Sequence, residues 1–184
     1  PSGPRIAWRQ EVWPVQWRIA ITWLSTYFTS QLFTPILFRV SGPVVAGQMG
    51  MTNTLSGVVT AMSSNWVVTK APRFGVLIAG RKWRELDRVF FRSLYVSMFV
   101  AASLAATAWL LIYALNQAGH SLATRILPPL PAALFLSASV ISSALASMTI
   151  YLRAHKREPL MIVFLAGALL TAGLTVLTVS RLGA

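Results

Sequence analysis

Four polar residues follow one another at intervals of four inside an otherwise apolar stretch: Gln48, Thr52, Ser56 and Thr60. Residues spaced by four lie on one face of an α-helix, so this spacing predicts a continuous polar stripe. Amide and hydroxyl groups in an apolar segment can hydrogen-bond a neighbouring helix, or they can line a water-filled cavity. Both interpretations stay open at this point.

Two neighbouring segments carry further polar groups that could serve such a cavity. Gln31 lies in the segment before the stripe, and Asn53 and Asn65 lie beside it. Arg18 and Arg39 flank the first segment, where they can either anchor it at a membrane interface or hold an anion. The complete candidate set for a substrate cavity is Arg18, Gln31, Arg39, Gln48, Thr52, Asn53, Ser56, Thr60 and Asn65.

The sequence contains no obvious set of catalytic residues. The two histidines, His120 and His155, are far apart in the sequence, and there is no cysteine. The four acids lie in arginine-rich surroundings that indicate ion pairs or solvated charges: Glu11, Glu85, Asp87 and Glu158. We therefore expect the chain not to be an enzyme and to hold no metal or other cofactor.

The composition predicts what positions these residues. Of 184 residues, 55% are hydrophobic and 11% charged, and the mean hydropathy is +0.64, which is typical of an integral membrane protein. The expected fold is an all-α bundle of five transmembrane helices, since each apolar segment approaches the roughly 20 residues that cross a bilayer. These spans are expected at about 17–40, 44–68, 94–115, 130–152 and 160–179, separated by Gly and Pro turns that include 41–43 and Gly119.

Basic residues are distributed very unevenly between the two sides of these spans. Thirteen of the 16 fall on the N-terminal flank, in the loop 69–93 and in the group 153–157. Only Arg39, Arg125 and Arg181 fall on the other side. The positive-inside rule then predicts a multi-pass membrane protein with a cytoplasmic N-terminus. Nucleic acid is not expected as a partner, because the basic residues form short blocks between apolar segments.

The loop 69–93 has an internal pattern of its own. Trp83, Leu86 and Phe90 recur at helical spacing, while Arg84, Arg88 and Arg92 share another face. This pattern predicts an amphipathic helix that enters the membrane through the headgroup layer.

Small residues at intervals of four predict where helices approach closely. The later spans contain such pairs at Ala101 with Ala105 and at Ala102 with Ala106. Ser139, Ser143 and Ser147 form a similar row, and Gly50 and Gly57 suggest a close neighbour on the second span.

Three stretches in this order resemble the second half of a bacterial polysaccharide flippase: GPVVAGQMGMTNTLSGVV, TKAPRFGVLIAGRKWRELDRVFFRS and YLRAHKREPL. The similarity is to the O-antigen and lipid-linked oligosaccharide flippases, whose superfamily also holds multidrug and toxin extruders. The resemblance implies two lobes of six helices around a central cavity. It also implies alternating access that carries a polyprenyl-pyrophosphate-linked glycan across the inner membrane for polysaccharide or lipopolysaccharide synthesis.

On this resemblance the chain is a fragment holding helices seven to eleven, and its last helix is missing. Residues 1–16 become the cytoplasmic linker between lobes, and 17–184 the transmembrane lobe. The implied partners are the lipid-linked glycan, membrane lipids and the missing N-terminal lobe. The start at Pro1, without Met, also leads us to expect a longer parent protein.

Arg18 and Arg39 are then candidates to hold the pyrophosphate, and the amides of the candidate set to accompany the sugars. No acid lies within a predicted span, so a buried carboxylate for coupling transport to protons is not expected in this half. Two alternatives remain: a lobe of a multidrug or toxin extruder, and a structural membrane subunit that transports nothing.

Overall fold

A computed structural model describes residues 13–31, 33–155 and 161–182, and its regular elements in these ranges are all helices. The predicted all-α class is confirmed. The elements are α1 (Trp13–Gln31), α2 (Phe33–Val68), α3 (Ala71–Ala79), α4 (Trp83–Gln117), the 3₁₀ turn η2 (Ala123–Arg125), α5 (Pro129–Ala154) and α6 (Met161–Leu182). Of the predicted linker 1–16, residues 1–12 lie outside the described ranges, and 13–16 already belong to α1.

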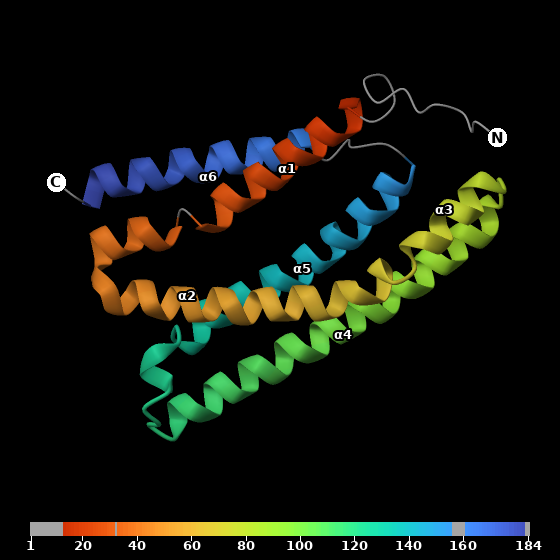
Figure 1. The fold of residues 1–184 in the computed structure, drawn as a ribbon. Coiled ribbons are helices and arrows are strands. Elements are labelled where there is room, and N and C mark those ends of the chain that lie inside the picture. Colours follow the sequence, from red (N-terminus) through yellow and green to blue (C-terminus); the bar gives the residue numbers. More distant parts are fainter. Residues whose placement is uncertain (1–12, 32, 156–160, 183–184) are drawn as a thin grey trace, which may run out of the picture.

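Helix α2 consists of two limbs that reverse direction at Gly42 (Figure 1). Gly42 has φ 85° and ψ 173°, a conformation that only glycine adopts readily, and Pro43 follows it. The limb before Gly42 continues the course of α1, and the limb after it returns across the molecule. The turn predicted at 41–43 is confirmed, and so is the break at Gly119, which has φ 61°.

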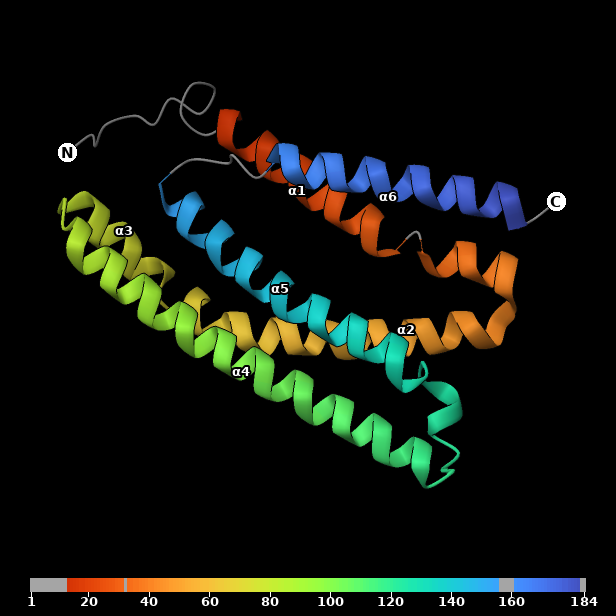
Figure 2. The ribbon, with the colours of Figure 1, turned by 180° about the vertical axis from the view of Figure 1, so that it is seen from behind.

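Three long helices pack on one another: the second limb of α2, α4 and α5. We call these three the central bundle. Helix α1 packs chiefly on α6, and this pair lies along one side of the central bundle in both views (Figures 1 and 2). One apolar core joins Val59 of α2 to Ala101 and Ala105 of α4 and to Leu136 of α5.

The predicted loop 69–93 is helical over most of its length. Helix α3 occupies 71–79, and α4 begins at Trp83 and continues without interruption to Gln117. The predicted faces are confirmed in part: Leu86 and Phe90 are buried beside Phe74 of α3, and the three arginines on the other face are exposed. Trp83, the first residue of the predicted apolar face, is exposed. Burial of this apolar face folds α3 back onto the start of α4.

Charge collects at one end of the molecule, because alternate helix ends lie together there (Figure 1). The start of α1, the α2–α3–α4 connection and the end of α5 share this end. The described basic residues on these segments are Arg18, Lys70, Arg73, Arg81, Lys82, Arg84, Arg88, Arg92 and Arg153. Arg5, Arg9, Lys156 and Arg157 were predicted to join them and lie outside the described residues.

The central bundle differs from a water-soluble protein in that large apolar side chains are exposed and many hydroxyls are buried beside its apolar core. Its exposed side chains are largely apolar, and Phe99 of α4 and Leu130 of α5 are 75% and 76% exposed. Its buried side chains include many hydroxyls, among them Thr52, Ser63, Ser97, Ser139, Ser143 and Ser147. Two helices in the described ranges, α4 and α5, are long and apolar enough to cross a membrane.

The burial of Ser143 against α2 generates a stability prediction. Ser143→Leu adds volume to a fully buried position and should destabilise the fold by about 1–3 kcal/mol through overpacking. Ser142→Leu is the matched control, because Ser142 is exposed and its hydroxyl bonds only the Ala138 carbonyl of its own helix. Thermal unfolding of the purified chain in detergent measures both. Equal loss of stability in the two variants would contradict the packing of α5 on α2.

Candidate functional site

The predicted polar stripe of α2 faces α5 along its middle. Thr60 Oγ1 donates to the Ser56 carbonyl at 3.0 Å and lies 3.4 Å from the Ser139 carbonyl oxygen of α5. One turn further on, Ser63 Oγ lies 2.9 Å from Ser143 Oγ. Ser143 in turn donates to the Ser139 carbonyl at 2.9 Å. We call this contact, made by Thr60 and Ser63 with Ser139 and Ser143, the hydroxyl seam.

The start of the stripe contacts the connection between α4 and α5. Gln48 Nε2 donates to the Thr124 carbonyl oxygen at 2.8 Å. Thr52, which is fully buried, donates to the Gln48 carbonyl at 2.9 Å and accepts from the Leu127 amide at 3.3 Å. These side chains therefore bond backbone groups of the α4–α5 connection, and the part-buried Leu127 amide is the one that would otherwise lack a partner.

Ser56 lies on the same face and differs from its neighbours. Its Oγ is buried and finds no hydrogen-bond partner among the described residues, and Ser97 of α4 shares this property. A small hydroxyl without a partner still allows helix backbones to approach closely.

The other predicted site residues are distributed over separate parts of the molecule. Arg18 is exposed in the second turn of α1, and Arg39 is exposed near the Gly42 reversal. Figure 1 shows these two parts of the chain at opposite ends of the molecule, so the two arginines do not form a single anion site. Asn53 is half-buried and Asn65 exposed on α2, and the side chain of Gln31 lies outside the described ones.

The side of α2 that faces away from the hydroxyl seam is open. Thr54 and Ala61 are exposed there, and a Cβ atom added at Gly50 or Gly57 would meet nothing within 4 Å. The close neighbour expected at these two glycines is therefore not present within the described chain. We call this side the open face of α2, defined by Gly50, Thr54, Gly57 and Ala61.

The sequence missed the partners of the stripe. Nothing in the spacing of α2 alone identifies the Leu127 amide or the Thr124 carbonyl as its contacts. The row of Ser139 and Ser143 at an interval of four was the available signal, since it matches the interval of the stripe.

Comparison of the chain with protein-family models, with curated proteins and with solved structures finds no match. The resemblance to polysaccharide flippases therefore stays a prediction.

The buried contact of Thr52 generates a second prediction. Thr52→Val removes the acceptor of the Leu127 amide, and the orphaned amide should cost about 1–3 kcal/mol of stability. Thr54→Val is the control, because Thr54 is exposed and bonds only the Gly50 carbonyl of its own helix. Chemical or thermal unfolding in detergent measures the difference. A Thr52→Val variant as stable as Thr54→Val would mean that water reaches the Leu127 amide.

Proposed function

We propose that this chain is an integral membrane bundle that forms one lobe of a transporter for lipid-linked glycans. The observation that carries the membrane part is the exposure of large apolar side chains on the central bundle together with the burial of many hydroxyls. In lipid, burying leucine between helices brings no hydrophobic gain, because the surrounding acyl chains are equally apolar. Small or hydroxyl-bearing residues mediate the helix contacts instead. The buried serines of α5 and the exposed aromatics of α4 follow this rule.

The distribution of charge supports the same proposal. The described basic residues gather at the end of the bundle that holds α3, and far fewer lie at the Gly42 end. This asymmetry is the one that orients multi-pass proteins, and it supports a cytoplasmic position for the α3 end.

The open face of α2 supports the transport part. A helix that faces only lipid should be apolar on its outer side, whereas this face carries Thr54 and two glycines beside Ala61, with Asn53 nearby. Such a surface suits either a second lobe of the same protein or a hydrated path along which sugars move. The amides of Asn53 and Asn65 provide donors and acceptors that match sugar hydroxyls.

Arg18 and Arg39 enter the proposal in a revised form. Because they lie at opposite ends of the molecule, they cannot grip one pyrophosphate together. In an alternating-access cycle they would instead meet the pyrophosphate in turn, one at each side of the membrane.

A structural membrane subunit is the second candidate, and one observation favours it. The hydroxyls of Thr52 and Thr60, two of the predicted cavity residues, are used in contacts within the bundle. A stripe used in this way needs no water and no substrate.

Aqueous thiol labelling distinguishes the two candidates. The chain has no native cysteine, so single cysteines can be placed at Asn53, Thr54 and Ala61 without interference. In membrane vesicles, a membrane-impermeant maleimide should label these positions if a hydrated path runs along α2. A polyprenyl-pyrophosphate oligosaccharide should slow that labelling.

Two kinds of control position show what labelling is expected at buried and at lipid-facing sites. Cysteines at Ser63 and Ser143 report the buried hydroxyl seam, and a cysteine at Phe99 reports the exposed surface of α4. All three should stay unlabelled. Protection of Asn53, Thr54 and Ala61 to the same degree would rule out a hydrated path and favour the structural subunit.

A further inference from the structure

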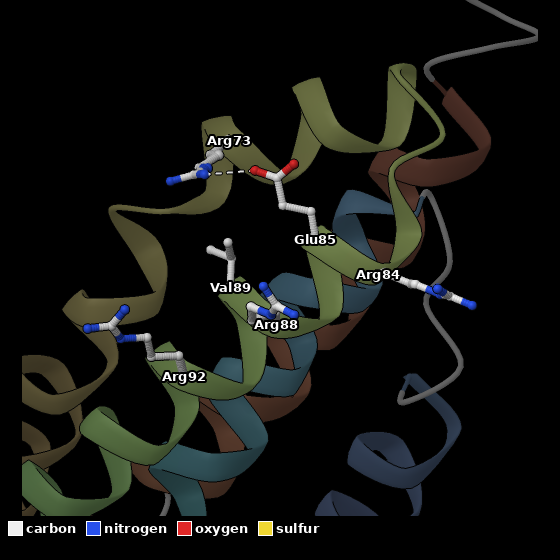
Figure 3. Close-up of a pocket in the computed structure, with 6 residues that line it drawn as sticks. All are labelled: Arg73, Arg84, Glu85, Arg88, Val89 and Arg92. Atoms are coloured by element: carbon white, nitrogen blue, oxygen red, sulfur yellow. Dashed lines mark hydrogen bonds and ion pairs between the residues drawn. The ribbon is translucent and has the colours of Figure 1, made fainter.

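A basic groove lies where α3 folds back on α4 (Figure 3). It consists of two adjoining hollows of about 550 Å³ and 380 Å³ that share Arg73, Val89 and Arg92 in their walls. Arg88 lines the first hollow, and Lys70 and Trp66 line the second. We call the two hollows together the α3–α4 groove.

The groove carries more positive charge than the described chain neutralises. Its one acid, Glu85, forms an ion pair with Arg73 at 2.9 Å, and both side chains are substantially exposed. Arg88 and Arg92 have no carboxylate partner among the described residues, and they lie one turn apart on α4. Like charges at this spacing repel each other, so an anion bound between them would relieve a local cost.

The arginines belong to different elements that meet at the groove. Arg73 comes from α3, while Arg88 and Arg92 come from successive turns of α4 (Figure 3). Arg84 also lies at the first hollow, but Figure 3 shows its guanidinium directed away from the Arg73–Glu85 pair. An anion between Arg73 and the α4 arginines would therefore join α3 to α4.

One end of the groove is apolar. Trp66 of α2 and Val96 of α4 line the second hollow, and both side chains are exposed. The surface of α4 continues beyond Val96 as Phe99, which is also exposed. Tryptophan beside basic residues, followed by an apolar surface, is typical of the interface between headgroups and acyl chains.

We propose that the α3–α4 groove binds the headgroup of an anionic phospholipid. Its phosphate contacts Arg88 and Arg92, with Arg73 and Lys70 at the edge, and its acyl chains lie over Val96 and Phe99. Guanidinium groups bind phosphate oxygens through paired, charge-assisted hydrogen bonds, and basic pockets at the cytoplasmic side of membrane helices suit such headgroups. The apolar end favours a lipid over free phosphate, which would leave Trp66 and Val96 without a partner. This inference rests on the proposed insertion in a membrane and is independent of transport.

Native mass spectrometry of the purified chain, with phosphatidylglycerol titrated into the detergent, tests the groove directly. Arg88→Gln with Arg92→Gln should weaken binding roughly ten- to thirtyfold, since each basic residue near a headgroup contributes roughly a factor of five. Lys82→Gln with Arg125→Gln removes the same charge from exposed residues outside the groove and should change the affinity little. Arg88→Lys with Arg92→Lys keeps the charge but loses the paired hydrogen bonds, so its affinity should lie between that of the unchanged chain and that of the Gln pair, which separates loss of charge from loss of folding.

Four results would overturn the proposal. The first is equal weakening by the Gln pair in the groove and the Gln pair outside it. The second is displacement of the lipid by millimolar inorganic phosphate, together with equal affinities for phosphatidylcholine and phosphatidylglycerol. This result would indicate a site for free phosphate. The third is release of the chain from membranes by alkaline carbonate, which would also overturn the proposed function. The fourth is retention of the chain in the membrane together with an unchanged phosphatidylglycerol affinity in the variant with Arg88→Gln and Arg92→Gln. This result would overturn the groove proposal and leave the proposed function standing.

Discussion

The hydroxyl contact between α2 and α5 is the constraint on which the rest of the arrangement depends. Ser63 and Ser143 meet at 2.9 Å, and this approach is possible because neither side chain extends beyond its hydroxyl. Larger residues at these positions would separate the helices and open the apolar core that joins Val59 to Leu136. With the seam closed, α4 packs on both helices and the central bundle is complete.

Closure of the seam also decides which polar groups of α2 are available for function. Thr52, Thr60 and Ser63 turn toward the bundle, and their hydroxyls have partners there. Thr54 and Ala61 turn outward onto the open face. Any substrate or second lobe that meets α2 therefore meets the open face, and not the stripe that first suggested a cavity.

The sequence predicted the elements that depend on local chemistry. Gly42 with Pro43 marked the reversal of α2, and the alternation of Leu86 and Phe90 with arginines marked the amphipathic start of α4. The pairing of faces was harder to predict, because spacing gives a helix face but not its neighbour. Of the two alanine pairs on α4, Ala101 with Ala105 is buried, whereas Ala102 with Ala106 is exposed. Only the position of α2 and α5 around α4 distinguishes them.

Tertiary geometry also explains what sequence reasoning could not find at the basic end. Helix α3 was predicted as loop, since nine residues with a proline near the start are too few to show a clear period. Its packing on Phe90 brings Arg73 beside Glu85, twelve positions away, and so forms a groove that no linear motif encodes.

If the central bundle lies in a membrane as proposed, its apolar exterior faces lipid while its hydroxyls face inward. Spin labels at Phe99, Leu110 and Ala101 of α4, with the chain in liposomes, test it most directly. Labels at the exposed Phe99 and Leu110 should collide readily with oxygen and rarely with a water-soluble nickel chelate, whereas a label at the fully buried Ala101 should be shielded from both. Ready collision of the nickel chelate at Phe99 and Leu110 would place this surface in water and contradict the proposed insertion in a membrane.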